Sequence, residues 1–384
     1  MNSQACRPVV AAVCGDAGGA AALLPVLQHL NEQNQVIIHA FAYTHGERML
    51  RTAGFTVESI PVDASASWIK ERLTATNARL LLAATSDNGL DHERRFVAGA
   101  RQCGIQSLGV LDFWSNYARR FATTEHPLGA LPDILAVMDD HAMQGLQAAG
   151  IPASVIRVTG HPGFDTLSMR RAAFSAADAK VLRHRIGTPD EALLILFVSQ
   201  PFEHGASVSI LDAETLGFTA NQVQTAVIAA ARNIASRRRV PVHLVIRPHP
   251  RERLTVRSEA APLLTVSVVS DTDRHDTVLA SDLVVGMNSM LLVEACILGR
   301  PVLSVQPEIK IKDPLPTNAQ GRSRPVYRWD EVEASLELLL FDDLTRSALI
   351  HRNITQEQFG GATARVVAHS RSLMSTNTHV LSAP

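Results

Sequence analysis

The stretch SDLVVGMNSMLLVEACILGRPVLSV, residues 281–305, decides the fold. It contains a short apolar run, Asp282–Val285, then a turn, the apolar stretch Ser289–Leu298, and a second apolar run, Pro301–Val305. Short runs that are apolar throughout are typical of strands buried on both faces, and a Ser or Asn before an apolar stretch is typical of a capped helix. The segment therefore predicts a strand–helix–strand unit with parallel strands.

The same alternation continues on both sides of this segment, so we expect two such layers in one chain. In the first half we expect strands at Pro8–Cys14, Val36–Ala42, Phe55–Ile60, Arg79–Ala84, Ile105–Leu111 and Asp133–Val137, with helices at Ala20–Leu30, Ala66–Thr76, Asp91–Gln102 and Asp140–Ala149. In the second half we expect further strands at Ala192–Val198, Pro241–Ile246 and Leu264–Val268, with helices at Thr219–Ser236 and Thr272–Ala280. The prediction is a doubly wound α/β protein in which two Rossmann-like domains face each other across a cleft. Ligands bind at the carboxyl ends of the strands in such folds.

The composition sets limits on function. The 384 residues, of which 46% are hydrophobic and 19% charged, can form the cores of two domains, and they exclude global disorder. A net charge of −1 and a pI of about 7.0 argue against broad electrostatic capture of nucleic acid or anionic membranes. The apolar run near the N-terminus is too short for a membrane span and too weakly charged in front for a signal peptide, so we expect neither. The four cysteines are scattered without a CxxC pair, which predicts neither a disulfide framework nor a zinc site and favours a reducing cytoplasm.

Carboxylates follow three of the expected strands in the first half of the chain. Asp16 lies in a turn with Gly15 and Gly18, and Asp87 and Asp112 follow the strands that end at residues 84 and 111. Neighbouring parallel strands would bring these acids to one edge, where a carboxylate shielded from water can act as a general acid or base. The glycines would let a ligand approach the backbone, although G-x-G-x-x-G spacing is absent. Helix capping is the alternative role for each aspartate.

The second half contains a cationic corner and a candidate phosphate site. Arg247 and His249 lie at a strand end together with Pro248 and Pro250. This rigid cationic corner would suit a phosphate or the edge of a nucleobase. Backbone N–H groups at the start of the helix after residue 288 would hold a phosphate, and one carboxylate lies within that apolar helix. The candidate binding residues there are Asn288, Ser289, Met290 and Glu294.

Two histidines, His161 and His204, lie on expected strand-end loops and are further candidates for substrate binding. Their spacing from other candidate ligands does not predict a metal site. We therefore expect neither a metal nor a cofactor.

Three motifs in these regions resemble known families. They are Ile156–Asp165 (IRVTGHPGFD), Arg247–Pro250 (RPHP), and the pair Ser281–Glu294 and Gly299–Val302. Together they resemble the two-Rossmann-domain (GT-B) glycosyltransferases. Within these, they are similar to the group that contains UDP-N-acetylglucosamine 2-epimerases, lipid A disaccharide synthase, and capsule polysaccharide and CDP-glycerol transferases.

The resemblance implies roles for individual residues. Ser289 would bind the donor phosphate and Glu294 the donor ribose, while Arg247 and His249 would face the nucleotide. Asp87 and Asp112 fall where the epimerases keep catalytic carboxylates. The implied domains are an acceptor and catalytic domain over residues 1–167 and a nucleotide-sugar-binding domain over residues 168–345. A C-terminal helix in residues 346–384 would pack back on the first domain, followed by a frayed tail.

The sequence departs from the epimerase pattern at three places. The loop at residues 111–116 reads LDFWSN where VEAGLR is expected, residues 287–290 read MNSM for DSGG, and residues 199–205 replace an expected HRREN loop. These departures weaken the epimerase assignment and favour sugar transfer, or an unusual branch of the group.

We therefore expect an inverting glycosyltransferase that moves a sugar from a nucleotide-activated donor to a hydroxyl acceptor, in bacterial surface-glycan or glycoconjugate biosynthesis. Asp112, Asp87 or Asp16 would be the base. A nucleotide-sugar 2-epimerase or hydrolase and a non-catalytic nucleotide-binding protein remain alternatives. The expected partners are the donor and a small-molecule or glycan acceptor, without nucleic acid, and a homodimer is left open.

Overall fold

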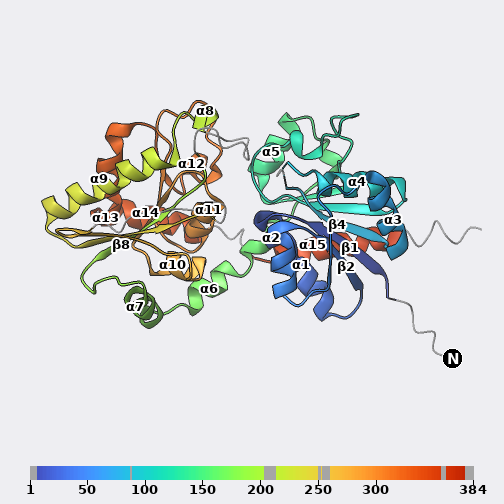
Figure 1. Ribbon diagram of the computed structural model, residues 1–384, viewed down its shortest axis with the longest axis horizontal. Coiled ribbons are helices and arrows are strands. Elements are labelled where there is room, and N and C mark those ends of the chain that lie inside the picture. Colours follow the sequence, from blue (N-terminus) through green and yellow to red (C-terminus); the bar gives the residue numbers. More distant parts are fainter. Residues whose placement is uncertain are drawn as a thin grey trace, which may run out of the picture. The chain divides into compact units, whose positions relative to one another are not determined.

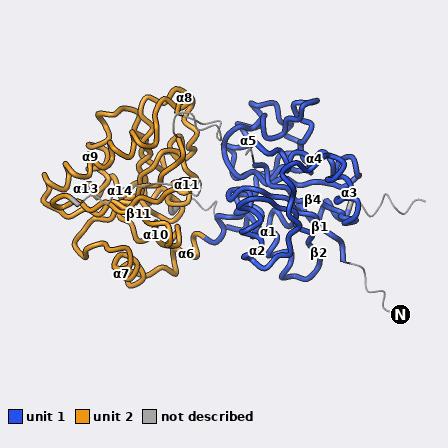
Figure 2. The backbone as a smooth tube through the Cα atoms, viewed as in Figure 1, with its two compact units in different colours: residues 1–166, 358–384 blue, residues 167–357 orange. Residues whose placement is uncertain are grey.

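The computed structural model describes residues 7–86, 89–202, 213–249, 252, 260–355 and 360–376 (Figure 1). The chain forms two compact units, Met1–Thr166 with Gln358–Pro384, and Leu167–Glu357 (Figure 2). Each unit is built around one sheet with helices on both faces, as the apolar runs predict. Among the described residues, no helix is both long and apolar enough to cross a bilayer.

The first unit contains a parallel sheet with the strand order β3-β2-β1-β4-β5-β6-β7. Its strands are β1 (Val9–Cys14), β2 (Ile37–Ala42), β3 (Val57–Ser59), β4 (Leu80–Ala84), β5 (Gln106–Val110), β6 (Ile134–Val137) and β7 (Ile156–Val158). Its helices are α1 (Ala17–Glu32), α2 (Thr44–Thr52), α3 (Ala66–Thr76), α4 (His92–Gln102), α5 (Asp140–Ala148) and α15 (Ala362–Thr376), with short 3₁₀ turns at Arg119–Phe121, Ala153–Val155 and Pro162–Phe164. Helices α1 and α15 contribute to one buried cluster against the sheet, and α3 and α4 contribute to another.

The second unit contains a sheet with the order β10-β11-β9-β8-β12-β13-β14, parallel except at the short edge strand β10. Its strands are β8 (Leu193–Val198), β9 (Val242–Arg247), β10 (Ala260–Ala261), β11 (Leu264–Val268), β12 (Leu283–Gly286), β13 (Val302–Val305) and β14 (Arg324–Val326). Its helices are α6 (Leu167–Ala173), α7 (Ala176–Arg185), α8 (Ala213–Leu216), α9 (Ala220–Arg238), α10 (Arg274–Ala280), α11 (Met290–Ile297), α12 (Pro316–Ala319), α13 (Val332–Phe341) and α14 (Asp343–Thr355), with a 3₁₀ turn at Trp329–Glu331. The strand–helix–strand segment quoted above forms β12, α11 and β13, in parallel pairing.

The chain returns to the first unit only at its last described helix. Helices α13 and α14 belong to the second unit, whereas α15 packs on α1. The carboxylate of Asp165 accepts hydrogen bonds from the backbone N–H groups of Ala362 (3.0 Å) and Thr363 (2.7 Å) at the start of α15. Arg365 donates to the carbonyl of Thr159 (2.7 Å). The TGHPGFD segment thus docks the C-terminal helix.

Candidate functional site

Each sheet reverses its strand order at one place, and both places carry candidate residues. In the first unit β1 lies between β2 and β4, and in the second unit β8 lies between β9 and β12. The loops at the carboxyl ends of such strands diverge and leave room for a ligand. Asp16 follows β1, and Asn288 and Ser289 follow β12.

Asp16 is half-buried at the carboxyl end of β1 and caps helix α1. Its Oδ1 accepts a hydrogen bond from the backbone N–H of Gly19 (2.7 Å). Burial and the charge of Asp112 raise the pKa of Asp16, while the Gly19 N–H lowers it. A Cβ added to Gly18 would lie 3.2 Å from Oδ2 of Asp112 and 3.7 Å from Oδ1 of Asp16. Gly18 is therefore flanked by both acids, and Asp16 has the helix-capping role that the sequence offers as one alternative.

Asp112 lies in a buried ion pair with Arg120, which also donates to the carbonyls of Thr85 (2.6 Å) and Ser115 (2.8 Å). Both side chains of the pair are more than nine-tenths buried. Because a buried guanidinium needs a counter-charge, Asp112 holds Arg120 in place. The more exposed Asp16 is the better placed of the two acids to reach a ligand.

The Asp112–Arg120 pair leads to a stability prediction. Asp112→Asn keeps the side-chain shape but removes the charge, so we expect the free energy of unfolding to fall by about 2 kcal/mol. Urea denaturation at pH 7 measures this change. The surface replacement Asp63→Asn serves as the control and is expected to change the free energy by less than about 0.5 kcal/mol. A loss for Asp112→Asn as small as the control's would contradict the proposed role of the pair.

A third acid, Glu93, lies in the first turn of α4 and is 1% exposed. Its Oε2 accepts a hydrogen bond from the hydroxyl of Tyr43 (2.6 Å). Burial raises the pKa of Glu93 to about 8; the charges of Asp16 and Asp112 add to this rise, and the Tyr43 hydroxyl opposes it. Glu93 is therefore neutral at pH 7 while Asp112 is paired with a cation. The same edge thus holds a buried carboxyl with a raised pKa beside a carboxyl that pairs with Arg120.

In the second unit, a reciprocal amide pair fixes the turn between β12 and α11. The backbone N–H of Asn288 donates to Oε1 of Gln200 (2.9 Å), and Nε2 of Gln200 donates to Oδ1 of Asn288 (2.9 Å). Nδ2 of Asn288 is buried without a hydrogen-bond partner among the described residues. Ser289 caps α11 by accepting from the N–H of Leu291 (3.2 Å). The turn therefore offers an amide donor beside the first N–H groups of a helix, which begins at Met290.

The RPHP corner is more engaged than its sequence indicates. Arg247 ends β9 and donates to the carbonyl of Thr272 (2.9 Å), and burial lowers the pKa of its guanidinium. The backbone N–H of His249 donates to Oε2 of Glu252 (2.6 Å), whose Oε1 accepts from the hydroxyl of Ser199 (2.9 Å). Arg247 and His249 therefore lie at the carboxyl edge near β8, with the side chain of Arg247 and the backbone of His249 held by neighbouring residues.

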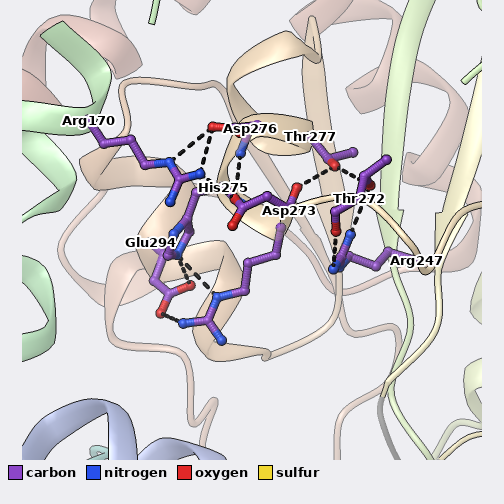
Figure 3. Close-up of polar contacts among 9 residues, drawn as sticks. Arg170, Arg247, Thr272, Asp273, His275, Asp276, Thr277 and Glu294 are labelled. Atoms are coloured by element: carbon purple, nitrogen blue, oxygen red, sulfur yellow. Dashed lines mark hydrogen bonds and ion pairs between the residues drawn. The ribbon is translucent and has the colours of Figure 1, made fainter. Parts of the chain in front are cut away.

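Glu294 lies on α11 and is buried against α10. Its carboxylate forms an ion pair with Nη2 of Arg274 (3.2 Å) and a hydrogen bond with Nε2 of His275 (3.0 Å). Figure 3 shows Glu294 and His275 side by side, and the guanidinium of Arg170 reaches Asp276 (2.8 Å) nearby. Two side chains within the unit therefore partner this apolar-flanked carboxylate. A ribose hydroxyl would have to share Glu294 with them.

The remaining candidates lie elsewhere. His161 stacks on Phe164 with ring centroids 4.3 Å apart, and its Nδ1 accepts from the N–H of Gly163 (3.1 Å) in the segment that docks α15. Asp87 and His204 fall outside the described residues. Within the described ranges, no group of three or more His, Cys, Asp or Glu side chains could hold a metal ion.

Four residues of these sites were not expected from the sequence: Tyr43, Glu93, Arg120 and Gln200. Glu93 had a readable signal, because it follows an expected strand by a short loop and lies in the first turn of an expected helix. Tyr43 directly follows β2, and Asp16 follows β1 after a single residue, Gly15.

No protein-family model matches the chain, and no curated protein is significantly similar to it in sequence. Its structure is nevertheless similar to solved structures over nearly the whole chain. One is UDP-GlcNAc 2-epimerase from Neisseria meningitidis bound to UDP-GlcNAc, with a TM-score of 0.67, 14% identity and coverage of 95% of this chain and 100% of that one. Another is Staphylococcus aureus MnaA in complex with UDP, with a TM-score of 0.68, 13% identity and coverage of 96% and 97%.

A glycosyltransferase from Rickettsia africae is also similar, with a TM-score of 0.59, 12% identity and coverage of 97% of both chains. The chain has the GT-B fold. This confirms the fold expected from the sequence motifs, including its two Rossmann-like sheets. In this GT-B chain, Asp16 and Asn288 each follow a strand that borders the reversal point of its sheet. At these levels of identity the similarity establishes the fold, whereas the activity has to be argued from the residues.

Proposed function

We propose that this GT-B protein is an enzyme of nucleotide-activated sugars and, specifically, an inverting glycosyltransferase. The observation that carries the proposal is the half-buried carboxylate of Asp16 at the carboxyl edge of the first sheet, with a raised pKa and two further acids beside it. Such a carboxylate is suited to accept a proton near neutral pH. The similar structures that were solved with UDP and with UDP-GlcNAc support a nucleotide-linked ligand.

In the proposed reaction, Asp16 takes the proton from an acceptor hydroxyl as its oxygen bonds to the anomeric carbon of the donor. The bond between that carbon and the phosphate oxygen breaks, and the nucleotide leaves with the electron pair. The N–H groups at the start of α11, with Nδ2 of Asn288, would hold the phosphates in the second unit. Arg247 would add positive charge at the neighbouring strand end. The proposed reaction uses no cofactor. We favour a hydroxyl group of a surface glycan or glycoconjugate as the acceptor.

A nucleotide-sugar 2-epimerase is the second candidate. It is supported by the 2-epimerases among the similar structures and by the neutral Glu93 beside ionisable Asp16, since proton removal and return need two acids in unlike states. The same first-unit site would serve both reactions.

A donor screen tests the proposal. We expect one class among UDP-, CMP-, GDP- and CDP-sugars to raise the melting temperature through binding linkage. Asn288→Asp places a negative charge beside the phosphates and should abolish that rise, whereas the exposed replacement Asn34→Asp should not. Product analysis with and without a pool of hydroxyl acceptors then separates the candidates. Acceptor-dependent nucleotide release supports transfer, and a rearranged sugar without acceptor supports epimerisation. Binding without either product would contradict both and leave a binding role.

A further inference from the structure

A hydrogen bond spans the end of β1 from its two neighbouring strands. Tyr43 follows β2, Glu93 lies on the helix after β4, and β1 lies between these two strands. The hydroxyl of Tyr43 donates to Oε2 of Glu93 over a distance of 2.6 Å. We call this contact the Tyr43–Glu93 bridge.

The bridge lies directly against the turn that carries Asp16. A Cβ added to Gly15 would overlap the ring of Tyr43, so the ring lies on the backbone of Gly15. The carbonyl of Gly15 also accepts hydrogen bonds from the hydroxyl of Thr44 (2.6 Å) and the N–H of Gly46 (2.6 Å). Gly15, the residue before Asp16, is thus held by the Tyr43 ring of the bridge and by hydrogen bonds from the first turn of α2.

Glu93 faces titratable or charged groups from every element around it. Its acidic neighbours are Asp16 and Asp112. Arg120 and Glu93 both line a cavity of about 10 Å³, which has room for roughly one water. The other groups are Cys14 on β1, His92 and Arg94 on α4, and Tyr43 itself. Oε1 of Glu93 is buried without a partner among the described residues. The buried carboxyl of Glu93 therefore lies beside Asp16 and Asp112, whose charges disfavour a negative charge on Glu93 itself.

Resting on the proposed function, we propose that Tyr43 and Glu93 are positioning residues for Asp16, and that the Glu93 proton controls how basic Asp16 is. Among the described residues, Asp16 forms no ion pair, whereas Asp112 is paired with Arg120. Once Glu93 ionises, its charge makes Asp16 a stronger base. Two coupled acids would then set the working pH range of the site.

The first test does not depend on activity. The chain has three tyrosines, so ¹³Cζ-tyrosine NMR gives few resonances, and Tyr43→Phe assigns the one from Tyr43. We expect that resonance to titrate with a midpoint near pH 8 in the wild type and to lose this step in Glu93→Gln. In Asp16→Asn the midpoint should fall, because a like charge is removed. The other two tyrosines are internal controls. No step between pH 6 and 9, or an unchanged midpoint in Asp16→Asn, would overturn the coupling.

The second test uses turnover on the donor found by screening. We expect a severalfold rise in kcat as the pH passes about 8, and Glu93→Gln should lack this step. Tyr43→Phe keeps the ring on Gly15 but loses the hydroxyl, so kcat should fall severalfold while KM for the donor is unchanged. In Tyr43→Phe the step in kcat should also move to higher pH, because the Tyr43 hydroxyl lowers the pKa of Glu93 in the wild type. A step that persists in Glu93→Gln would refute the positioning role. If no nucleotide sugar turns over, the proposed function fails, and the NMR result still decides the bridge.

Discussion

Asp16→Asn is expected to lower turnover by roughly 10² to 10⁴, the range that a positioned general base contributes. Asparagine is as good a helix cap as aspartate, so its amide oxygen can still accept from the N–H of Gly19 and α1 should be preserved. Nucleotide binding should be unchanged, because the proposed phosphate site lies in the other unit. Initial rates at saturating donor, together with melting temperatures with and without nucleotide, measure both expectations.

The matched control is Asp139→Asn. Asp139 caps α5 in the same unit by accepting from the N–H of Ala142 (2.8 Å), and its replacement also removes one carboxylate from a helix cap. We expect turnover of this variant within about threefold of the wild type. If turnover of Asp16→Asn also stayed within about threefold of the wild type, Asp16 would not be the base, and Asp87 would become the candidate.

Glu93→Gln is expected to change how stability depends on pH. Burial raises the pKa of Glu93 from 4.5 to about 8, so the folded protein binds a proton more tightly than the unfolded chain. The stability that this proton provides is complete below pH 4.5. It is lost at about 1.4 kcal/mol per pH unit as the pH rises toward 8, and then levels off. Because glutamine does not titrate, the free energy of unfolding of the variant should rise relative to that of the wild type across this range, by a few kcal/mol in total.

Denaturant unfolding of the two proteins at pH 5, 6, 7 and 8 measures the difference. The control is Glu125→Gln, an exposed glutamate in the same unit, for which the difference from wild type should not vary with pH. A Glu93→Gln difference that stays constant from pH 5 to 8 would show that Glu93 is ionised throughout, and it would remove the basis for the coupled acids.

Most of the fold could be predicted because the strands are buried on both faces. The expected strand Leu264–Val268 and helix Ala66–Thr76 have the bounds of the observed elements, and other expected strands differ by a residue or two. The short edge strand β14 was not predicted, because three residues (Arg-Pro-Val) carry no periodicity. Helix α2 was missed for a related reason. Its sequence THGERMLRT has only two buried residues, and its position is fixed by contacts with Gly15.

The candidate sites were predicted less completely. A carboxylate that follows a strand is visible in the sequence, which is why Asp16 and Asp112 were both candidates. Which of them is paired was not visible, since Arg120 lies eight residues after Asp112 and reaches back through a 3₁₀ turn. Gln200 and Asn288 are 88 residues apart, and only the pairing of β8 with β12 brings them together. Contacts of this kind depend on sheet topology.

The attachment of α15 to the first unit has a consequence for biosynthesis. Val366, Val367 and Met374 on this helix belong to the same buried cluster as β1 and α1. During translation, the second unit is therefore fully synthesised before the first unit receives its last core residues. A fragment that stops at Thr166 would expose the apolar surface that α15 covers. We expect the nascent N-terminal half to depend on chaperones until the ribosome releases the chain.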